Sequence, residues 1–234
     1  MKGVLYLIPS LLGPEGMSAA FAPQVLDTVR KLTHFVAEDA KSARRFLKQV
    51  GMPVPLVQLP IVELNEHTRA ERIRELLTPL RGGHDVGLLS EAGCPGIADP
   101  GAELVAAAHR EGLRVAPLVG PSSLLLALMA CGLNGQQFCF HGYLPAQRGA
   151  REQAIRQIES ESSSRHVTQL FIEAPYRNNQ LLAALLATLR PSTRLCLATD
   201  LMQPTQSIVT RSAQSWKAGL PDIDRRPTVF LLLA

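Results

Sequence analysis

Apolar and polar residues follow two periods along the chain, one typical of strands and the other of helices. Short runs rich in Val, Ile, Leu and Phe are bounded by turn-forming residues, as buried strands are. The expected strands are Gly3–Pro9, His34–Ala37, Leu56–Leu59, Val86–Leu89, Arg114–Leu118, Phe138–His141, Thr168–Ile172, Arg194–Ala198, Thr205–Thr210 and Thr228–Leu233.

Helical periodicity separates these runs. In the segment Ala40–Val50, two sets of residues recur at i, i+3, i+4 and i+7, which places them on two faces of one helix. The apolar set is Ala43, Phe46, Leu47 and Val50, and the basic set is Lys41, Arg44, Arg45 and Lys48. We predict a second amphipathic helix over Ile73–Leu80 and a buried helix over Leu181–Leu189.

Asp99 and Pro100 are typical of an N-cap followed by proline at the first helical position, so a helix is expected from there to about Glu111. Ser160–Ser164, with the sequence SESSS, is expected to be a flexible loop because of its serine-rich composition.

Alternation of strands and helices indicates an α/β fold with substantially parallel sheets. The last third differs, because Arg194–Ala198 and Thr205–Thr210 are close enough to form a hairpin, which requires a mixed sheet. A strand ends in the turn Gly120-Pro121, which places a domain boundary near Leu118–Gly120. We therefore expect two α/β domains, residues 1–118 and 119–234.

Composition agrees with a globular chain. Of the 234 residues, 46% are hydrophobic and 19% charged, so the chain can bury a core without a disulfide or a structural metal.

The four cysteines form no CxxC or Cys/His pair with zinc spacing, so no metal is expected. No apolar run is long enough to cross a membrane and no cleavage signal follows the N-terminal strand, so a cytoplasmic location is expected. The net charge of +4 permits an anionic partner without demanding one.

Several common catalytic motifs are absent from the sequence. There is no G-x-G-x-x-G, G-x-x-x-x-G-K-[ST], G-x-S-x-G or H-E-x-x-H. These absences argue against a dinucleotide oxidoreductase, a P-loop nucleotidase, a serine hydrolase of the common type and a zinc protease.

Two loops of small residues follow expected strands and are candidate ligand sites. Ser90–Gly96 follows Val86–Leu89, and the loop Leu118–Ser123 follows the next strand. Ligands of parallel sheets bind at the carboxyl ends of strands, where small residues allow close approach of the backbone. A structural turn explains the first loop equally well, and helix capping by Ser122 or Ser123 explains the second.

Charged residues beside these loops have two interpretations each. Glu38 and Asp39 close the second strand and are either a base or orienting group, or simply carboxylates favoured at a helix N-terminus. The basic set on Ala40–Val50 is either a solvated face or a nucleic-acid contact. Arg44 and Arg177 are candidate cations for positioning the acceptor, and Glu173 lies beside Arg177 at a strand end.

Six blocks, in order, resemble one family. They are Leu5–Gly13, Ala37–Leu47, Ser90–Gly101, Val119–Ser123, Phe140–Pro145 and Phe171–Arg177. The chain resembles the S-adenosylmethionine-dependent methyltransferases with the tetrapyrrole-methylase fold. Within them it is most similar to the branch that 2′-O-methylates a cytidine of small-subunit ribosomal RNA.

The resemblance implies two α/β domains with S-adenosylmethionine in the cleft between them, and a homodimer. It implies that RNA or a ribosomal subunit is the partner. The cofactor-binding residues that it implies are Pro9, Ser90, Glu91, Ala92, Gly93, Ile97, Ala98, Pro121, Ser122, Ser123 and Tyr143.

The chain departs from the ribosomal branch at three places, which are Glu91 for Asp, Pro14 for Asn, and Thr199-Asp200 for Arg-Glu. These departures indicate a divergent subfamily. Two other functions therefore stay open, a porphyrinoid C-methyltransferase and a non-catalytic protein that binds S-adenosylmethionine or RNA. Tetrapyrrole enzymes have Gly-Asp-Pro where this chain has Ser90–Gly93, which favours RNA.

Overall fold

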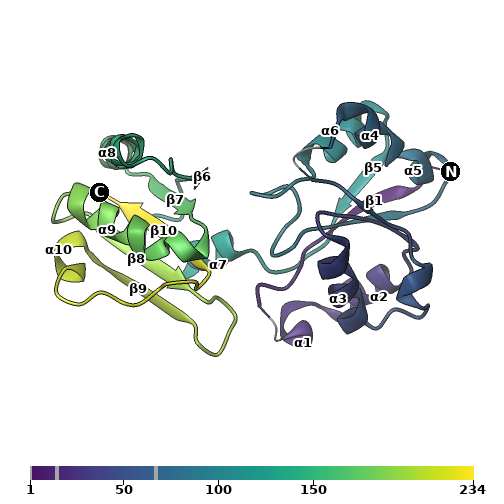
Figure 1. Cartoon of the computed structure of the whole chain (residues 1–234), viewed down its shortest axis with the longest axis horizontal. Helices are drawn as coiled ribbons and strands as arrows, with labels where there is room; N and C mark the ends of the chain where they lie inside the picture. The colour runs from purple at the N-terminus through teal and green to yellow at the C-terminus, as the bar shows by residue number, and fades with distance from the viewer. Residues whose placement is uncertain (1, 14–15, 66–67) are drawn as a thin grey trace. The chain divides into compact units, whose positions relative to one another are not determined.

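A computed structural model describes residues 2–13, 16–65 and 68–234 and divides the chain into two compact units. Unit 1 is Met1–Ser122 and unit 2 is Ser123–Ala234 (Figure 1). Pro14, one of the departures from the family pattern, lies outside the described residues. None of the described helices is both long and apolar enough to cross a lipid bilayer.

Unit 1 is built on a five-stranded sheet whose neighbouring strands all run parallel, in the order β3-β2-β4-β1-β5. The strands are β1 (Val4–Ile8), β2 (His34–Ala37), β3 (Ile61–Glu63), β4 (Val86–Leu89) and β5 (Arg114–Pro117). The helices are α1 (Met17–Ala20), α2 (Pro23–Arg30), α3 (Ala40–Val50), α4 (Ala70–Glu75), α5 (Thr78–Arg81) and α6 (Ala102–Arg110), with a 3₁₀ turn η1 (Leu56–Gln58).

Helices cover both faces of this sheet, as Figure 1 shows for unit 1. On one face, α2 and α3 pack on Ile8 and Phe35 through residues that include Val29 and Leu47. On the other face, α4, α5 and α6 pack on Leu5, Val36 and Leu88. The period-two alternation of the strands thus sends successive side chains into two separate cores.

Unit 2 is built on a mixed sheet in the order β6-β7-β10-β8-β9, in which only β6 and β7 are parallel. The strands are β6 (Phe138–Tyr143), β7 (Thr168–Ile172), β8 (Arg194–Thr199), β9 (Ser207–Ser212) and β10 (Thr228–Leu233). The helices are α7 (Ser123–Ala130), α8 (Arg148–Arg165), α9 (Asn178–Thr188) and α10 (Ala213–Trp216), with a 3₁₀ turn η2 (Pro175–Arg177). The α/β class, the parallel and mixed sheets and the β8–β9 hairpin are confirmed.

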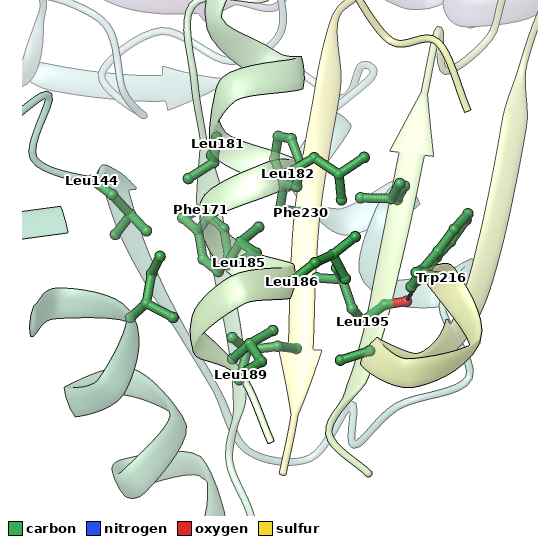
Figure 2. Close-up of a cluster of buried hydrophobic side chains, with 14 of the residues drawn as sticks. Leu144, Phe171, Leu181, Leu182, Leu185, Leu186, Leu189, Leu195, Trp216 and Phe230 are labelled. Atoms are coloured by element: carbon green, nitrogen blue, oxygen red, sulfur yellow. Dashed lines mark hydrogen bonds between the residues drawn. The ribbon is translucent and has the colours of Figure 1, made fainter. Parts of the chain in front are cut away.

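The core of unit 2 lies between its sheet and α8, α9 and α10. Figure 2 shows leucines of α9, among them Leu182 and Leu185, directed toward Phe230 of β10. The Phe230 ring stacks on Phe171 with centroids 5.8 Å apart. The indole of Trp216 is buried and donates a hydrogen bond to the Leu195 carbonyl at 2.9 Å, so its polar atom is satisfied.

Two predicted elements of unit 1, a strand and a helix, are wrong because proline residues interrupt them. Leu56–Leu59 is not a strand; Pro55 precedes a 3₁₀ turn there, and the chain joins the sheet only after Pro60, as β3. The single helix predicted over Ile73–Leu80 is two helices, α4 and α5. Pro79, in the first turn of α5, has no backbone N–H with which to continue the helix from α4.

The predicted loop Ser160–Ser164 is also wrong, because it forms the last turns of α8. Ser162 is fully buried, and its hydroxyl accepts a hydrogen bond from the backbone N–H of Ala234 at 3.0 Å. Glu159 accepts from the backbone N–H of Arg190 at 2.8 Å and from the Thr193 hydroxyl at 2.5 Å. Tertiary hydrogen bonds therefore hold a segment whose own residues have weak helix propensity.

Truncating Leu185 to Ala should destabilise unit 2, because Leu185 is fully buried in the cluster of Figure 2. We expect a loss of about 2–5 kcal/mol in the free energy of unfolding, measured by urea denaturation. Leu220→Ala is the matched control, because that side chain is 60% exposed. A loss as small for Leu185→Ala as for the control would contradict the packing described here.

Candidate active site

Polar residues gather at the carboxyl ends of β2 and β4 in unit 1. These strands are parallel neighbours, with Ala37 opposite Leu89. Glu38 and Asp39 follow β2, and Ser90 and Glu91 follow β4, so all four lie at the same edge of the sheet. The Ser42 hydroxyl of α3 donates to Glu91 Oε1 at 3.4 Å, which joins the two segments.

The loop Ser90–Gly96 is fixed to the end of β1 by hydrogen bonds. The backbone N–H groups of Ser10 and Gly93 each donate to the other residue's carbonyl, at 2.8 and 3.2 Å. The Ser10 hydroxyl donates to the Ser90 carbonyl at 2.6 Å, and the Ser90 hydroxyl donates to the Gly93 carbonyl at 2.8 Å. Gly93 has a φ of 73°, a conformation that favours glycine.

The loop around Gly120 packs against the same region. A Cβ on Gly120 would lie 2.6 Å from the Cβ of Pro9 and 2.9 Å from the ring of Phe21. The Cys94 thiol donates to the Pro121 carbonyl at 3.6 Å, so the two loops are in contact. Burial raises the pKa of the Cys94 thiol, which makes this cysteine a poor nucleophile. The structure therefore brings Pro9, the Ser90–Gly93 segment and Pro121 together.

A cavity of about 860 Å³ opens at this edge of unit 1. Among the described residues, its charged lining residues are all acidic, and they come from three segments of the chain: Glu38, Asp39, Glu91, Asp99 and Glu103. Ala98 also lines it and has a φ of 59°, which is rare for a residue with a side chain and is concentrated at functional sites. A cavity of this size accommodates a small organic ligand, and its carboxylates favour a cationic one.

Asp39 serves α3 as its N-cap. Its Oδ2 accepts a hydrogen bond from the backbone N–H of Ser42 at 2.5 Å. This bond lowers the pKa of the Asp39 carboxyl, so the group holds a proton less readily than an ordinary aspartate. Glu38 is half-buried and lines the cavity. The roles predicted for both residues as base or orienting group stay predictions.

Asp99 does not cap α6, which corrects the prediction. The helix begins at Ala102, and Gly101, with a φ of 129°, occupies the N-cap position without a side-chain hydrogen bond. Gly101 signals this shift in the sequence, because Asp-Pro-Gly is typical of a turn. Asp99 Oδ2 is buried and has no hydrogen-bond partner among the described residues. Burial, followed by the charges of Glu38 and Glu91, raises the pKa of Asp99 to about 6.

The basic face of α3 is exposed as its periodicity predicts. Ala43, Phe46, Leu47 and Val50 are buried, and Lys41, Arg44, Arg45 and Lys48 are exposed. Within the described residues none of these four cations forms an ion pair with a carboxylate; Arg44 donates only to the Ala40 carbonyl, at 3.5 Å. Their positive charge is therefore directed to solvent.

The remaining predicted site residues lie elsewhere. Ile97 is 50% exposed on the loop before α6. Ser123 begins α7 and Tyr143 ends β6, so both belong to unit 2. Arg177 also belongs to unit 2, where its Nε and Nη2 donate to Glu173 Oε1 at 3.1 and 2.7 Å.

Glu173 is buried and fixes the Arg177 guanidinium at the end of β7. Asp200, which departs from the family pattern, has a structural role in unit 2. Its carboxylate accepts hydrogen bonds from Arg226 and Thr205, both at 2.8 Å. Within the described residues no group of His, Cys, Asp or Glu side chains could hold a metal ion.

Several curated proteins named "Ribosomal RNA small subunit methyltransferase I" are similar to the chain. The relative from Pseudomonas aeruginosa is 32% identical over 233 residues, which is 98% of this chain and 78% of that protein. The relative from Escherichia coli O157:H7 is 31% identical over 88% of this chain and 68% of its own length. The relative from Xylella fastidiosa is 37% identical over 83% of this chain and 67% of its own.

The chain belongs to the ribosomal RNA small subunit methyltransferase I family. It is an enzyme of the methyltransferase class, so the non-catalytic alternative is set aside. No family model matches the chain.

Solved structures place this family member in the tetrapyrrole-methylase fold. The methyltransferase CobJ has a TM-score of 0.63 and 19% identity, and the similarity covers 100% of this chain and 94% of that one. Cobalt precorrin-4 methyltransferase CbiF has a TM-score of 0.59 and 14% identity over 98% of this chain and 94% of that one. At these identities the likeness shows the fold alone.

Adding a methyl group at Gly120 should test how the loop around Gly120 packs on Pro9, because the new Cβ would overlap the Pro9 side chain. We expect Gly120→Ala to lower the free energy of unfolding by about 1–3 kcal/mol, measured by urea denaturation. Gly135→Ala is the control, since nothing lies within 4 Å of a Cβ there. Equal stability of the two variants would show that the loop around Gly120 is not packed on Pro9.

Proposed function

We propose that this enzyme transfers a methyl group from S-adenosylmethionine to a ribose 2′-hydroxyl of small-subunit ribosomal RNA. The observation that carries the proposal is the pairing of opposite charges in unit 1. A cavity whose described charged lining residues are all acidic lies at the N-terminal end of a helix with an exposed basic face. The similarity to ribosomal RNA methyltransferases over 88–98% of the chain supports it.

The residues of the cavity fit a cationic cofactor. S-adenosylmethionine, when bound, supplies an electrophilic methyl group on a positively charged sulfur. The carboxylate of Glu91 favours such a charge, and none of the described lining residues carries a positive charge that would oppose it. The backbone of Ser90–Gly93, together with Pro9, Ala98, Pro121 and Ser122, would hold the cofactor, because these small residues leave main-chain groups accessible.

The basic face of α3 suits an RNA backbone. Its four cations are exposed and are not neutralised by described carboxylates, so they are available to phosphates. Arg44 is the candidate for positioning the acceptor, and Arg177, held by Glu173, is the candidate cation of unit 2. Positioning of this kind is sufficient to supply much of the acceleration of a displacement at a sulfonium.

A porphyrinoid acceptor is the competing substrate. The structural neighbours include a uroporphyrin-III C-methyltransferase, at 19% identity and a TM-score of 0.54. That likeness concerns the fold, whereas the relatives above 30% identity are ribosomal RNA methyltransferases by name. RNA is therefore the acceptor that we propose.

Methyl transfer should be tested with tritiated S-adenosylmethionine and small ribosomal subunits from a strain that lacks the gene. We expect label in the small-subunit RNA, in a nucleotide whose 3′ phosphodiester bond resists alkaline cleavage because its 2′-oxygen is methylated. Large subunits and uroporphyrinogen III are the control acceptors. Label in the tetrapyrrole, with none in the RNA, would contradict the proposal.

Removing two cations from the basic face should weaken RNA binding in a salt-dependent way. For Arg45→Ala combined with Lys48→Ala, we expect the slope of log affinity against log salt concentration to shrink by up to about two units. Affinity for S-adenosylmethionine should stay unchanged, because both side chains lie outside the cavity lining.

The matched control is Arg110→Ala with Arg114→Ala. It removes the same charge from exposed positions near the start of β5, at the opposite end of the sheet. The contrary result would be an equal salt slope for the parent protein and both double variants. Binding would then not depend on the basic face of α3.

A further inference from the structure

Asp99 carries a buried carboxylate oxygen that the described residues of unit 1 leave without a hydrogen bond. This oxygen is Oδ2, and Asp99 does not cap α6. Leaving a buried acceptor unsatisfied destabilises the folded state. Buried polar atoms without a hydrogen-bond partner are rare in native structures, and a functional role is one explanation for them.

The surroundings of Asp99 provide that explanation. Asp99 lines the cavity, so a bound molecule can reach it. Four other carboxylates line the same cavity: Glu38 and Asp39 between β2 and α3, Glu91 after β4, and Glu103 on α6. The described lining residues from the segment after β3 and from α4 are uncharged: Leu64, Asn65, Thr68 and Ile73. No Lys, Arg or His occurs among the described lining residues, so no lining cation stabilises the charged form of Asp99.

Burial and the neighbouring charges of Glu38 and Glu91 raise the pKa of Asp99 to about 6. A carboxylate with this value is still mostly ionised at pH 7, yet it binds a proton far more strongly than an ordinary aspartate. A general base works best when its pKa lies near the working pH. Asp39 is different, because its carboxylate is committed to the N-terminus of α3 and its pKa is lowered.

We propose that Asp99 is the general base of the reaction and that its carboxylate accepts the proton of the acceptor hydroxyl. This inference rests on the proposed function, which supplies a hydroxyl acceptor and a sulfonium methyl donor. The hydroxyl O–H bond breaks and an O–CH₃ bond forms, while the C–S bond breaks with its electron pair left on sulfur. The proton is on Asp99 at the end of the step and passes to solvent when the product leaves.

Asp99→Asn tests the proposal, because the amide keeps the shape of the side chain but accepts no proton. We expect kcat for RNA methylation to fall about 100- to 10,000-fold, the range typical of a lost general base. The dissociation constant for S-adenosylmethionine, measured by calorimetry, should change less than about threefold. Asp27→Asn is the matched control, because that side chain is exposed on α2, away from the cavity lining, and pairs with Arg30.

The pH profile separates a base from a residue that merely shapes the cavity. For the parent protein, kcat/KM should fall with a slope of one below pH about 6, because protonated Asp99 cannot accept the hydroxyl proton. In Asp99→Asn the residual kcat/KM should no longer fall below pH about 6. Unchanged kcat and an unchanged pH profile would overturn the proposal. Loss of cofactor binding together with activity would also overturn it, because Asp99 would then hold the cofactor.

A titration of the protein without cofactor gives a second readout that needs no turnover. The carboxyl carbon of Asp99, followed by ¹³C NMR and assigned in the parent protein through its own backbone resonances, should titrate with a midpoint near 6. Glu38→Gln should lower this midpoint, because one of the neighbouring negative charges is removed.

A midpoint near 4 in the parent protein would overturn the proposal even if Asp99→Asn failed to fold. If the parent protein methylates no RNA, the proposed function and this inference both fail. If it methylates RNA as fast without the Asp99 carboxylate, only this inference fails.

Discussion

The complete burial of β4 is the constraint on which the architecture of unit 1 depends. Every residue of this strand is buried, and it hydrogen-bonds to β2 on one side and β1 on the other. At Gly87 the space is so limited that a Cβ would lie 2.6 Å from the side chain of Ile8 and 2.9 Å from Phe35. Because no polar side chain is tolerated along such a strand, the first polar groups after it appear at its carboxyl end. Ser90 and Glu91 stand there, beside Glu38 at the end of the parallel neighbour.

Helix α3 connects this edge to the surface. Its apolar face fills the core, its N-terminus is capped by Asp39, and its Ser42 hydroxyl reaches Glu91. Its remaining face carries the exposed cations. One amphipathic helix therefore separates two electrostatic environments, an acidic cavity at its first turn and a basic surface along its length. A cationic cofactor and an anionic nucleic acid would each be attracted to a different part of this arrangement, which reduces competition between them.

The sequence predicts the parts of the fold that local pattern determines. β2, α3, β4 and β10 have the predicted bounds, because a continuous apolar run or helical periodicity extends to their last residue. The segment Ser160–Ser164 shows the limit of such reasoning. Its helix depends on hydrogen bonds to Ala234, Arg190 and Thr193, which are distant in sequence. No window of the sequence contains those partners, so propensity alone predicts a loop.

For the candidate site too, local sequence pattern accounts for some residues and not for others. Loops of small residues at strand ends identify Ser90–Gly93 and Gly120–Ser122, and the structure brings these loops into contact through Cys94 and Pro121. Asp99 was missed because its sequence neighbourhood, Asp-Pro, has a sufficient local explanation as a helix start. Only the structure shows that Gly101 moves the helix start forward and leaves the Asp99 carboxylate without a backbone partner. Its raised pKa arises from Glu38, Glu91 and burial together, and these meet only after β2 and β4 have paired. A property that requires three separate segments to be in place cannot be encoded in any one of them, which is why residues of this kind must be looked for among buried groups that the fold itself does not use.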